Sequence, residues 1–275
     1  MLIDCHVHLD PFSNEEVAEV LERARRVGVR FVISAGTTLE SSRRSVELAG
    51  MFPDLFSGVG VHPMNIREPI DEGAYMQLRD LALSTEKVLV ISEVGLDFME
   101  GAPDRALQYQ AFRAQVRLAR ELGLPIVFHS RESHSEVFRL LREERAYEVG
   151  GVMHYFQADE RTAKEAIDLG FYISLARPLL RLPHLQKVAA LLPLENIVLE
   201  TDAAPQPFKA KRENWTEPRH LRTIVEILSE LQHKPVEEVE EAVAANVQRL
   251  LGRGWPVVGH GGDANGQQEK VEHEL

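Results

Sequence analysis

Short apolar runs recur along the chain, separated by longer segments in which apolar residues return every three or four positions. Several runs, such as the one from Val88 to Ile91, are apolar at every position, which favours parallel strands covered on both faces. Eight runs predict strands, at residues 2–5, 30–34, 56–61, 88–92, 126–128, 151–153, 171–174 and 197–199. We therefore expect a buried, parallel sheet.

Between the strands the pattern takes the period of an amphipathic helix. The clearest helix lies between Pro103, which suits a helix start, and Gly123, which suits a helix end. One face of it carries an apolar stripe formed by Leu107, Ala111, Ala114, Leu118 and Leu122. Similar segments predict helices at about residues 14–27, 132–144, 160–169, 182–192, 217–231 and 236–251.

The alternation of strands and helices predicts an α/β protein. A chain of 275 residues suits a single-domain (β/α)8 TIM barrel, a fold that typically has about 250 residues. A doubly wound open sheet would show the same alternation. We assign the barrel to residues 1–254, and we expect a disordered tail at residues 255–275, which hold too few apolar side chains to pack.

Charge and cysteine content narrow the function classes. The 31 basic and 43 acidic residues give a net charge of −12, which opposes non-specific binding to nucleic acid or to an anionic membrane. No apolar stretch approaches the roughly 18 residues of a membrane span, and we expect no signal peptide. Cys5 is the only cysteine and cannot form an intrachain disulfide, so we expect a cytoplasmic protein. We also expect no obligate protein partner.

Histidines and carboxylates stand at the ends of the predicted strands. His6 and His8 are two positions apart, so on an extended strand they project from the same side and could grip one ion. Other ionisable residues follow five further strands: His62, Glu93, His129, His154 and Asp202. Each alone is better explained as a polar residue at a strand end. In a barrel, however, all of these positions meet at the mouth where catalytic groups lie, so together they predict one site.

The donor set favours metal ions. Four histidines and two carboxylates suit zinc, manganese or another transition ion, and one carboxylate can bridge two ions. Two ions at one site would acidify a water molecule and hold a substrate oxygen, which is the chemistry of a hydrolase.

Six motifs together make the chain resemble the TatD family of metal-dependent hydrolases. They are His6-Val7-His8, Gly60-Val61-His62-Pro63, Glu93-Val94-Gly95-Leu96-Asp97, His129-Ser130-Arg131, His154-Tyr155-Phe156 and Glu200-Thr201-Asp202. The resemblance spans residues 1 to about 252 in motif order and spacing. It implies a TIM barrel of the amidohydrolase type and a phosphodiesterase or deoxyribonuclease activity on DNA ends or a small phosphodiester.

The resemblance also implies the role of each ligand. Two divalent ions, such as Zn²⁺, Mn²⁺ or Mg²⁺, would share Glu93. One ion would be held by His6, His8, Glu93 and Asp202, and the other by Glu93, His129 and His154. Asp202 would also be the general base, because a carboxylate beside the bridging water can accept its proton.

Three residues around these ligands have two interpretations each. His62 and Arg131 would hold a substrate phosphate, or else be a loop histidine and a salt-bridge partner at a helix start. Asp97 would orient a metal-ligating histidine, or else cap the following loop. Glu200 is expected to give structural support, as is Asn246 near the C-terminal end.

A small basic run follows the last strand. Lys209, Lys211 and Arg212 lie close to Phe208 and Trp215, and positive charge beside aromatic rings suits single-stranded nucleic acid. An ordinary solvated loop is an equal interpretation. We name Lys209 and Arg212 as candidate substrate contacts.

The chain departs from the TatD pattern at the mouth of the expected barrel. Gln157 and Ala158 stand where the family usually has serine and glycine, and Arg177 lies in a loop that commonly contains a glycine. Ser92 replaces the glycine before Glu93. These departures bear on substrate choice. A binuclear enzyme acting on a small ester, lactone or amide is therefore an alternative, and a non-catalytic metal-binding protein is another.

Overall fold

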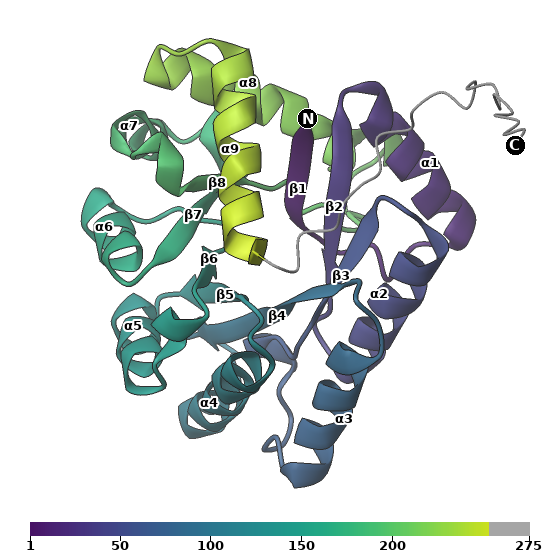
Figure 1. Cartoon of the computed structure of the whole chain (residues 1–275), viewed down its shortest axis with the longest axis vertical. Coiled ribbons are helices and arrows are strands. Elements are labelled where there is room, and N and C mark those ends of the chain that lie inside the picture. Colours follow the sequence, from purple (N-terminus) through teal and green to yellow (C-terminus); the bar gives the residue numbers. More distant parts are fainter. Residues whose placement is uncertain (253–275) are drawn as a thin grey trace, which may run out of the picture.

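The computed structural model describes residues 1–252, in which eight parallel strands pair in chain order and form a nearly closed barrel (Figure 1). This arrangement confirms the predicted TIM barrel and excludes a doubly wound sheet, in which the strand order would be shuffled. The strands are β1 (Leu2–Val7), β2 (Val29–Ala35), β3 (Leu55–Val59), β4 (Val88–Asp97), β5 (Ile126–Arg131), β6 (Gly151–Met153), β7 (Phe171–Leu175) and β8 (Ile197–Leu199).

The barrel closes between β1 and the segment that follows β8. The main-chain N–H of Asp202 donates to the carbonyl oxygen of His6 at 3.0 Å, and the N–H of His8 donates to the carbonyl oxygen of Ala203 at 2.7 Å. Below them the buried Asp4 carboxylate accepts hydrogen bonds from the N–H of Thr201 at 2.9 Å and from its hydroxyl at 2.5 Å. Closure therefore fixes Asp202 beside His6 and His8.

Helices surround the barrel (Figure 1). They are α1 (Asn14–Arg26), α2 (Leu39–Met51), α3 (Glu72–Leu83), α4 (Arg105–Leu122), α5 (His134–Glu143), α6 (Glu160–Asp168), α7 (Pro183–Leu191), α8 (Leu221–Gln232) and α9 (Val236–Leu251). The helix expected from residue 217 begins at Leu221, because Pro218–His220 form a 3-10 turn first. Helices α2 and α3 were not predicted.

The two helices that the pattern missed bury few apolar residues. The inward face of α2 includes Ser42 and Ser45, which interrupt the apolar period, and α3 buries only Leu78 and Ala82. The hydroxyl of Ser42 donates to the carbonyl oxygen of Gly60 at 3.1 Å, so a polar contact joins α2 to the end of β3. Apolar periodicity alone gives no signal for such a helix.

The barrel interior holds a separate apolar cluster that includes Ile3, Phe31 and Val198, and Val247 and Leu251 of α9 join it. Helix α9 thus covers the end of the barrel where the strands begin, and Figure 1 shows it crossing the barrel. As predicted, Asn246 gives support there, since its side-chain amide donates to the carbonyl oxygens of Leu194 and Ile197 at 2.8 and 2.6 Å.

Cys5 is a free, buried thiol in this interior cluster, although a regular strand would turn it away from His6. The register of β1 against β2 shifts between Asp4 and Val7, so Cys5 does not simply face away from His6. Both side chains lie on the interior side, Cys5 in the apolar cluster and His6 nearer the mouth.

Two further expectations concerned the C-terminal tail and membrane-spanning helices. The tail predicted at residues 255–275 lies outside the described residues. Within residues 1–252 no helix has the length and apolar character needed to cross a membrane.

Candidate metal centre

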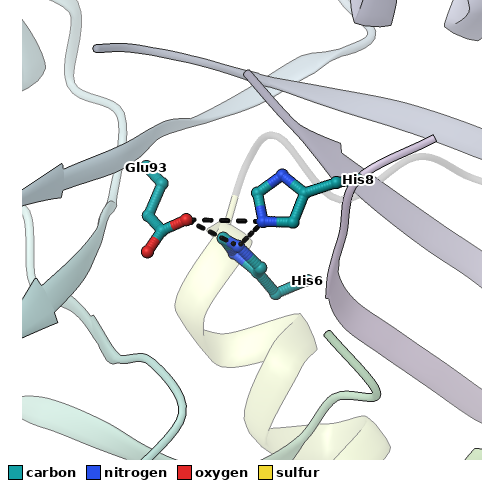
Figure 2. A group of neighbouring side chains, drawn as sticks. All are labelled: His6, His8 and Glu93. Carbon is teal, nitrogen blue, oxygen red and sulfur yellow. Dashed lines mark hydrogen bonds and ion pairs between the residues drawn. The ribbon is translucent and has the colours of Figure 1, made fainter. Parts of the chain in front are cut away.

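One oxygen of Glu93 is the meeting point of the two N-terminal histidines (Figure 2). The Nε2 atoms of His6 and His8 each lie 3.4 Å from Glu93 Oε2 and 3.2 Å from one another. Asp202 Oδ1 lies 3.4 Å from the same atom of His8. The four side chains expected to hold one ion are therefore in contact.

The other oxygen of Glu93 faces a second set of histidines. Glu93 Oε1 lies 3.2 Å from His129 Nδ1, 3.5 Å from His154 Nε2 and 3.3 Å from His62 Nε2. His154 Nε2 also lies 3.9 Å from Asp202 Oδ1. The structure thus brings all six predicted ligands together, with Glu93 between two groups.

Two of these residues were predicted to follow their strands but lie within them, and a third lies further from its strand than predicted. Strand β4 runs on to Asp97 and β5 to Arg131, so Glu93 and His129 lie inside strands rather than after them. His62 lies three residues beyond the end of β3, where it precedes a 3-10 turn. The residues still converge, because all of them lie near the same end of the barrel.

The spacing of these atoms fits bound metal. Ligand atoms at about 2.0–2.1 Å from a tetrahedral ion lie about 3.3–3.4 Å from one another. The triangle formed by His6 Nε2, His8 Nε2 and Glu93 Oε2 has sides of 3.2, 3.4 and 3.4 Å. A divalent ion between the three atoms would take the place of the protons that otherwise join them in hydrogen bonds.

Acceptors stand behind three of the histidines. His129 Nε2 lies 2.9 Å from Asp97 Oδ2, and His8 Nδ1 lies 3.1 Å from the carbonyl oxygen of Ala35. His154 Nδ1 lies 2.9 Å from Glu200 Oε1, an ion-pair distance that lacks the direction of a hydrogen bond. Such partners fix the tautomer and leave the other ring nitrogen free to bind metal. Asp97 therefore has the orienting position, and Glu200 does more than the structural support expected of it.

His62 differs from the other histidines. Its Nδ1 accepts a hydrogen bond from the main-chain N–H of Met64 at 3.1 Å, where it caps the 3-10 turn Pro63–Asn65. The proton of the neutral ring must then sit on Nε2, the atom that faces Glu93. His62 is therefore arranged as a hydrogen-bond donor into the site, which suits a substrate contact better than a metal ligand.

The charges in the site are strongly coupled. Burial would raise the pKa of Glu93, but His62 and His154 hold it well below its ordinary value. Burial would also raise the pKa of Asp202, but His8 and His154 lower it to about 2. Against burial, Asp202 and Glu93 raise the pKa of His8 well above its ordinary value. The two carboxylates thus favour positive charge here, which a divalent ion would supply in place of protons.

Asp4 is a positioning residue that the sequence reasoning did not single out. It is fully buried, and burial raises its pKa to about 8 against the hydrogen bonds from Thr201. Its contacts with Thr201 tie β1 to the segment that carries Asp202, whose own φ of 52° lies in the left-handed region. The only signal in the sequence was the position of Asp4 two residues before His6.

Five of the six metal-ligand candidates, all except His6, line a cavity of about 660 Å³ at the barrel mouth. Arg131 lines it, at the end of β5 and exposed to solvent, as do His62, Gln157 and Ala158. The departures from the TatD pattern at Gln157 and Ala158 are therefore at the place where a substrate would enter.

The residues of the basic run after β8 lie in different places. Lys209 lines a neighbouring cavity, and Phe208 beside it is 80% exposed. Arg212 instead lies over the rings of Phe12 and Trp215, at 5.0 and 4.4 Å from their centroids, and its Nη1 is 3.2 Å from Glu217. The structure does not bring Arg212 to either cavity, and these contacts give it a packing role.

We expect Asp97→Asn to lower the affinity for divalent metal by about 10- to 100-fold, because His129 loses the carboxylate behind it. The asparagine oxygen can still accept the 2.9 Å hydrogen bond from the N–H of Met99, so the loop should keep its shape. Metal affinity would be measured by competition with a chelator, with Asp80→Asn on the exposed face of α3 as the matched control. Equal affinities in the parent and Asp97→Asn would contradict the orienting role.

Several known proteins are similar to this chain in sequence. The model of the TatD related DNase family matches residues 3–252. The metal-dependent hydrolase YcfH of Escherichia coli K12 is 33% identical over 259 residues, which cover 91% of this chain and 95% of YcfH. A mouse relative named "Putative deoxyribonuclease TATDN3" is 31% identical over 265 residues, 91% of this chain and 88% of the relative.

A solved structure of a TatD homologue has the same fold as this chain. The crystal structure of YjjV, a TatD homologue from Escherichia coli K12, superimposes with a TM-score of 0.80 at 29% identity, and the match covers 90% of this chain and 97% of YjjV. The family match extends over nearly all of the described residues, including both sets of histidines around Glu93. The chain therefore belongs to the TatD family of metal-dependent hydrolases.

Proposed function

We propose that the protein is a phosphodiesterase that acts on DNA and holds two divalent metal ions. The observation that carries the proposal is the division of Glu93 between two groups, with Oε2 facing His6 and His8 and Oε1 facing His129 and His154. The description of the matching family and the name of the mouse relative, both of which refer to deoxyribonucleases, support DNA as the substrate.

The chain's own residues would divide the work of hydrolysis. Divalent ions, when bound, would supply Lewis acidity and make a water molecule more acidic. Asp202 is a carboxylate at neutral pH, so it is in the form that accepts the proton of that water. His62 Nε2–H and the Arg131 guanidinium are the donors at the cavity wall that would hold the phosphate oxygens.

The test of this proposal combines metal analysis with a cleavage assay. We would measure the metal content of the purified protein and its cleavage of single-stranded DNA and bis(p-nitrophenyl) phosphate, with and without added Mg²⁺, Mn²⁺ or Zn²⁺. Metal-dependent cleavage with two ions per chain is the expected result. Bound metal with neither substrate cleaved would overturn the phosphodiesterase proposal and favour a small ester, lactone or amide. A protein that binds metal but turns over none of these would be a non-catalytic metal-binding protein.

Arg131→Ala is expected to reduce kcat/KM on phosphodiesters by about 10-fold or more, because a charge-assisted contact to phosphate is lost. Hydrolysis of a neutral ester, where it is measurable, should fall much less. The matched control is Arg161→Ala, on the exposed side of α6. An equal loss on charged and neutral substrates would argue against a phosphate contact at Arg131.

A further inference from the structure

A second cavity, of about 440 Å³, lies next to the metal centre. The segment after β7 supplies Arg177 and Arg181 to its wall, and the loop after β8 supplies Lys209. Tyr155 lines both this cavity and the larger one that contains the metal-ligand candidates. A substrate bound at the metals could therefore extend past Tyr155 into this second, basic cavity.

The three cations of this cavity have no carboxylate partner among residues 1–252. Arg177 Nη1 donates to the hydroxyl of Thr216 at 3.0 Å, and Lys209 Nζ donates to the carbonyl oxygen of Asn214 at 2.9 Å, both of which are neutral acceptors. Elsewhere on the molecule, arginines such as Arg113 and Arg117 share a glutamate. In a chain with a net charge of −12, three unpaired cations around one cavity form a distinct positive region.

Two neighbouring basic groups have lowered pKa values. Burial and the proximity of Arg177 lower the pKa of Lys209. Burial, Arg177 and Arg219 lower the pKa of His220 to about 4. Burial is the larger cause of both shifts, and the positive charge of Arg177 adds to each of them.

The geometry leaves donors available for a ligand. A guanidinium has five N–H donors and an ammonium has three, and Arg177 and Lys209 each use one in the contacts above. Thr216 is itself fixed, because its hydroxyl donates to the side-chain oxygen of Gln206 at 3.2 Å and its N–H donates to the same atom at 2.8 Å. The Arg177 side chain is thus held in place before any anion binds, which lowers the cost of binding.

We propose that Arg177, Arg181 and Lys209 form a second phosphate subsite, which holds a phosphate of the substrate other than the one that is cleaved. This proposal rests on the proposed phosphodiesterase function, because it assigns the neighbouring part of the same substrate. The bound phosphate is either the adjacent internal phosphodiester of a strand or a terminal phosphate. Both present anionic oxygens to the same donors.

The experiment compares substrates that differ by one phosphate. The dinucleotide TpT has only the bond to be cleaved, pTpT adds a 5′-terminal phosphate, and TpTpT adds an internal one. We expect the parent to have a kcat/KM about 10-fold higher on pTpT, on TpTpT or on both than on TpT. The substrate that gains shows whether the subsite takes a terminal or an internal phosphate.

Arg181→Gln and Lys209→Gln should reduce that ratio by about 3- to 10-fold, because the added phosphate loses a cationic partner. Arg181 is exposed, so its replacement should not disturb folding. Lys187→Gln, which removes the same charge from the exposed side of α7, is the matched control. An equal loss on all three substrates, or an unchanged ratio, would overturn the subsite.

Binding separates a failure of the subsite from a failure of the proposed function. The affinity of the metal-loaded parent and of Arg181→Gln for fluorescein-labelled TpTpT would be measured by fluorescence anisotropy, which needs no turnover. Weaker binding by Arg181→Gln supports the subsite even if no substrate is cleaved, a result that would overturn only the phosphodiesterase proposal. Equal binding by the two proteins, or no binding by the parent, would overturn the subsite.

Discussion

Replacing Asp202 by asparagine should lower kcat by about 10²–10⁴-fold while the barrel stays folded, because the change removes the proton acceptor and weakens a metal ligand. Asparagine has nearly the same shape, and the hydrogen bond that closes the barrel comes from the main-chain N–H of residue 202 to His6. The side chain is therefore replaced without loss of the closing contact. The rate would be measured on single-stranded DNA at saturating metal.

The interpretation of this variant depends on a matched surface change. Asp80→Asn removes the same charge from the exposed face of α3, outside the candidate site, and should keep the parental rate. Thermal melting of both variants would show that each is folded. Near-parental turnover by a folded Asp202→Asn protein would remove Asp202 from the catalytic role.

Glu93→Gln should cost most of the bound metal as well as the activity, because both oxygens of this one carboxylate face histidine groups. The glutamine fills the same volume, so no cavity forms, but a neutral amide binds a divalent ion much less well than a carboxylate does. Metal that binds only the folded state raises the melting temperature. We therefore expect added Mn²⁺ or Zn²⁺ to raise the melting temperature of the parent clearly and that of Glu93→Gln very little.

Metal analysis provides the second measurement for Glu93→Gln. Glu226→Gln, at an exposed position of α8, is the control and should keep the metal content and the thermal shift of the parent. If Glu93→Gln retained the full metal content, Glu93 would not be a shared ligand. Loss of only one ion would assign it to a single site.

The convergence of the site could be predicted because it follows from the fold. His6 and Asp202 are almost two hundred positions apart in the sequence, yet both stand at the end of an apolar run, and a barrel brings such ends together. Their distances and partners could not be predicted. The sequence does not indicate that His62 receives a hydrogen bond from Met64, and this contact is what separates it from the other histidines.

Local pattern and tertiary contact disagree at two places. Regular alternation in β1 would have turned Cys5 away from His6, but the register shift before Val7 places both on the interior side. Arg212 stands in a basic run that suits nucleic acid, yet Phe12 and Trp215 take up its guanidinium. In each case a contact distant in the sequence decides the position of the side chain.

The closure of the barrel sets an order of events during synthesis. A ribosome makes the chain from its N-terminus, so His6 and His8 emerge early, while Asp202 and the main-chain hydrogen bonds that join it to β1 are made only when most of the polypeptide exists. A nascent chain that ends before residue 200 carries most of the candidate metal ligands but lacks Asp202 and the contacts that close the barrel. If the proposed site holds metal, its full set of ligands exists only after the chain has passed residue 202, and the bound metal would then link β1 to the segment after β8.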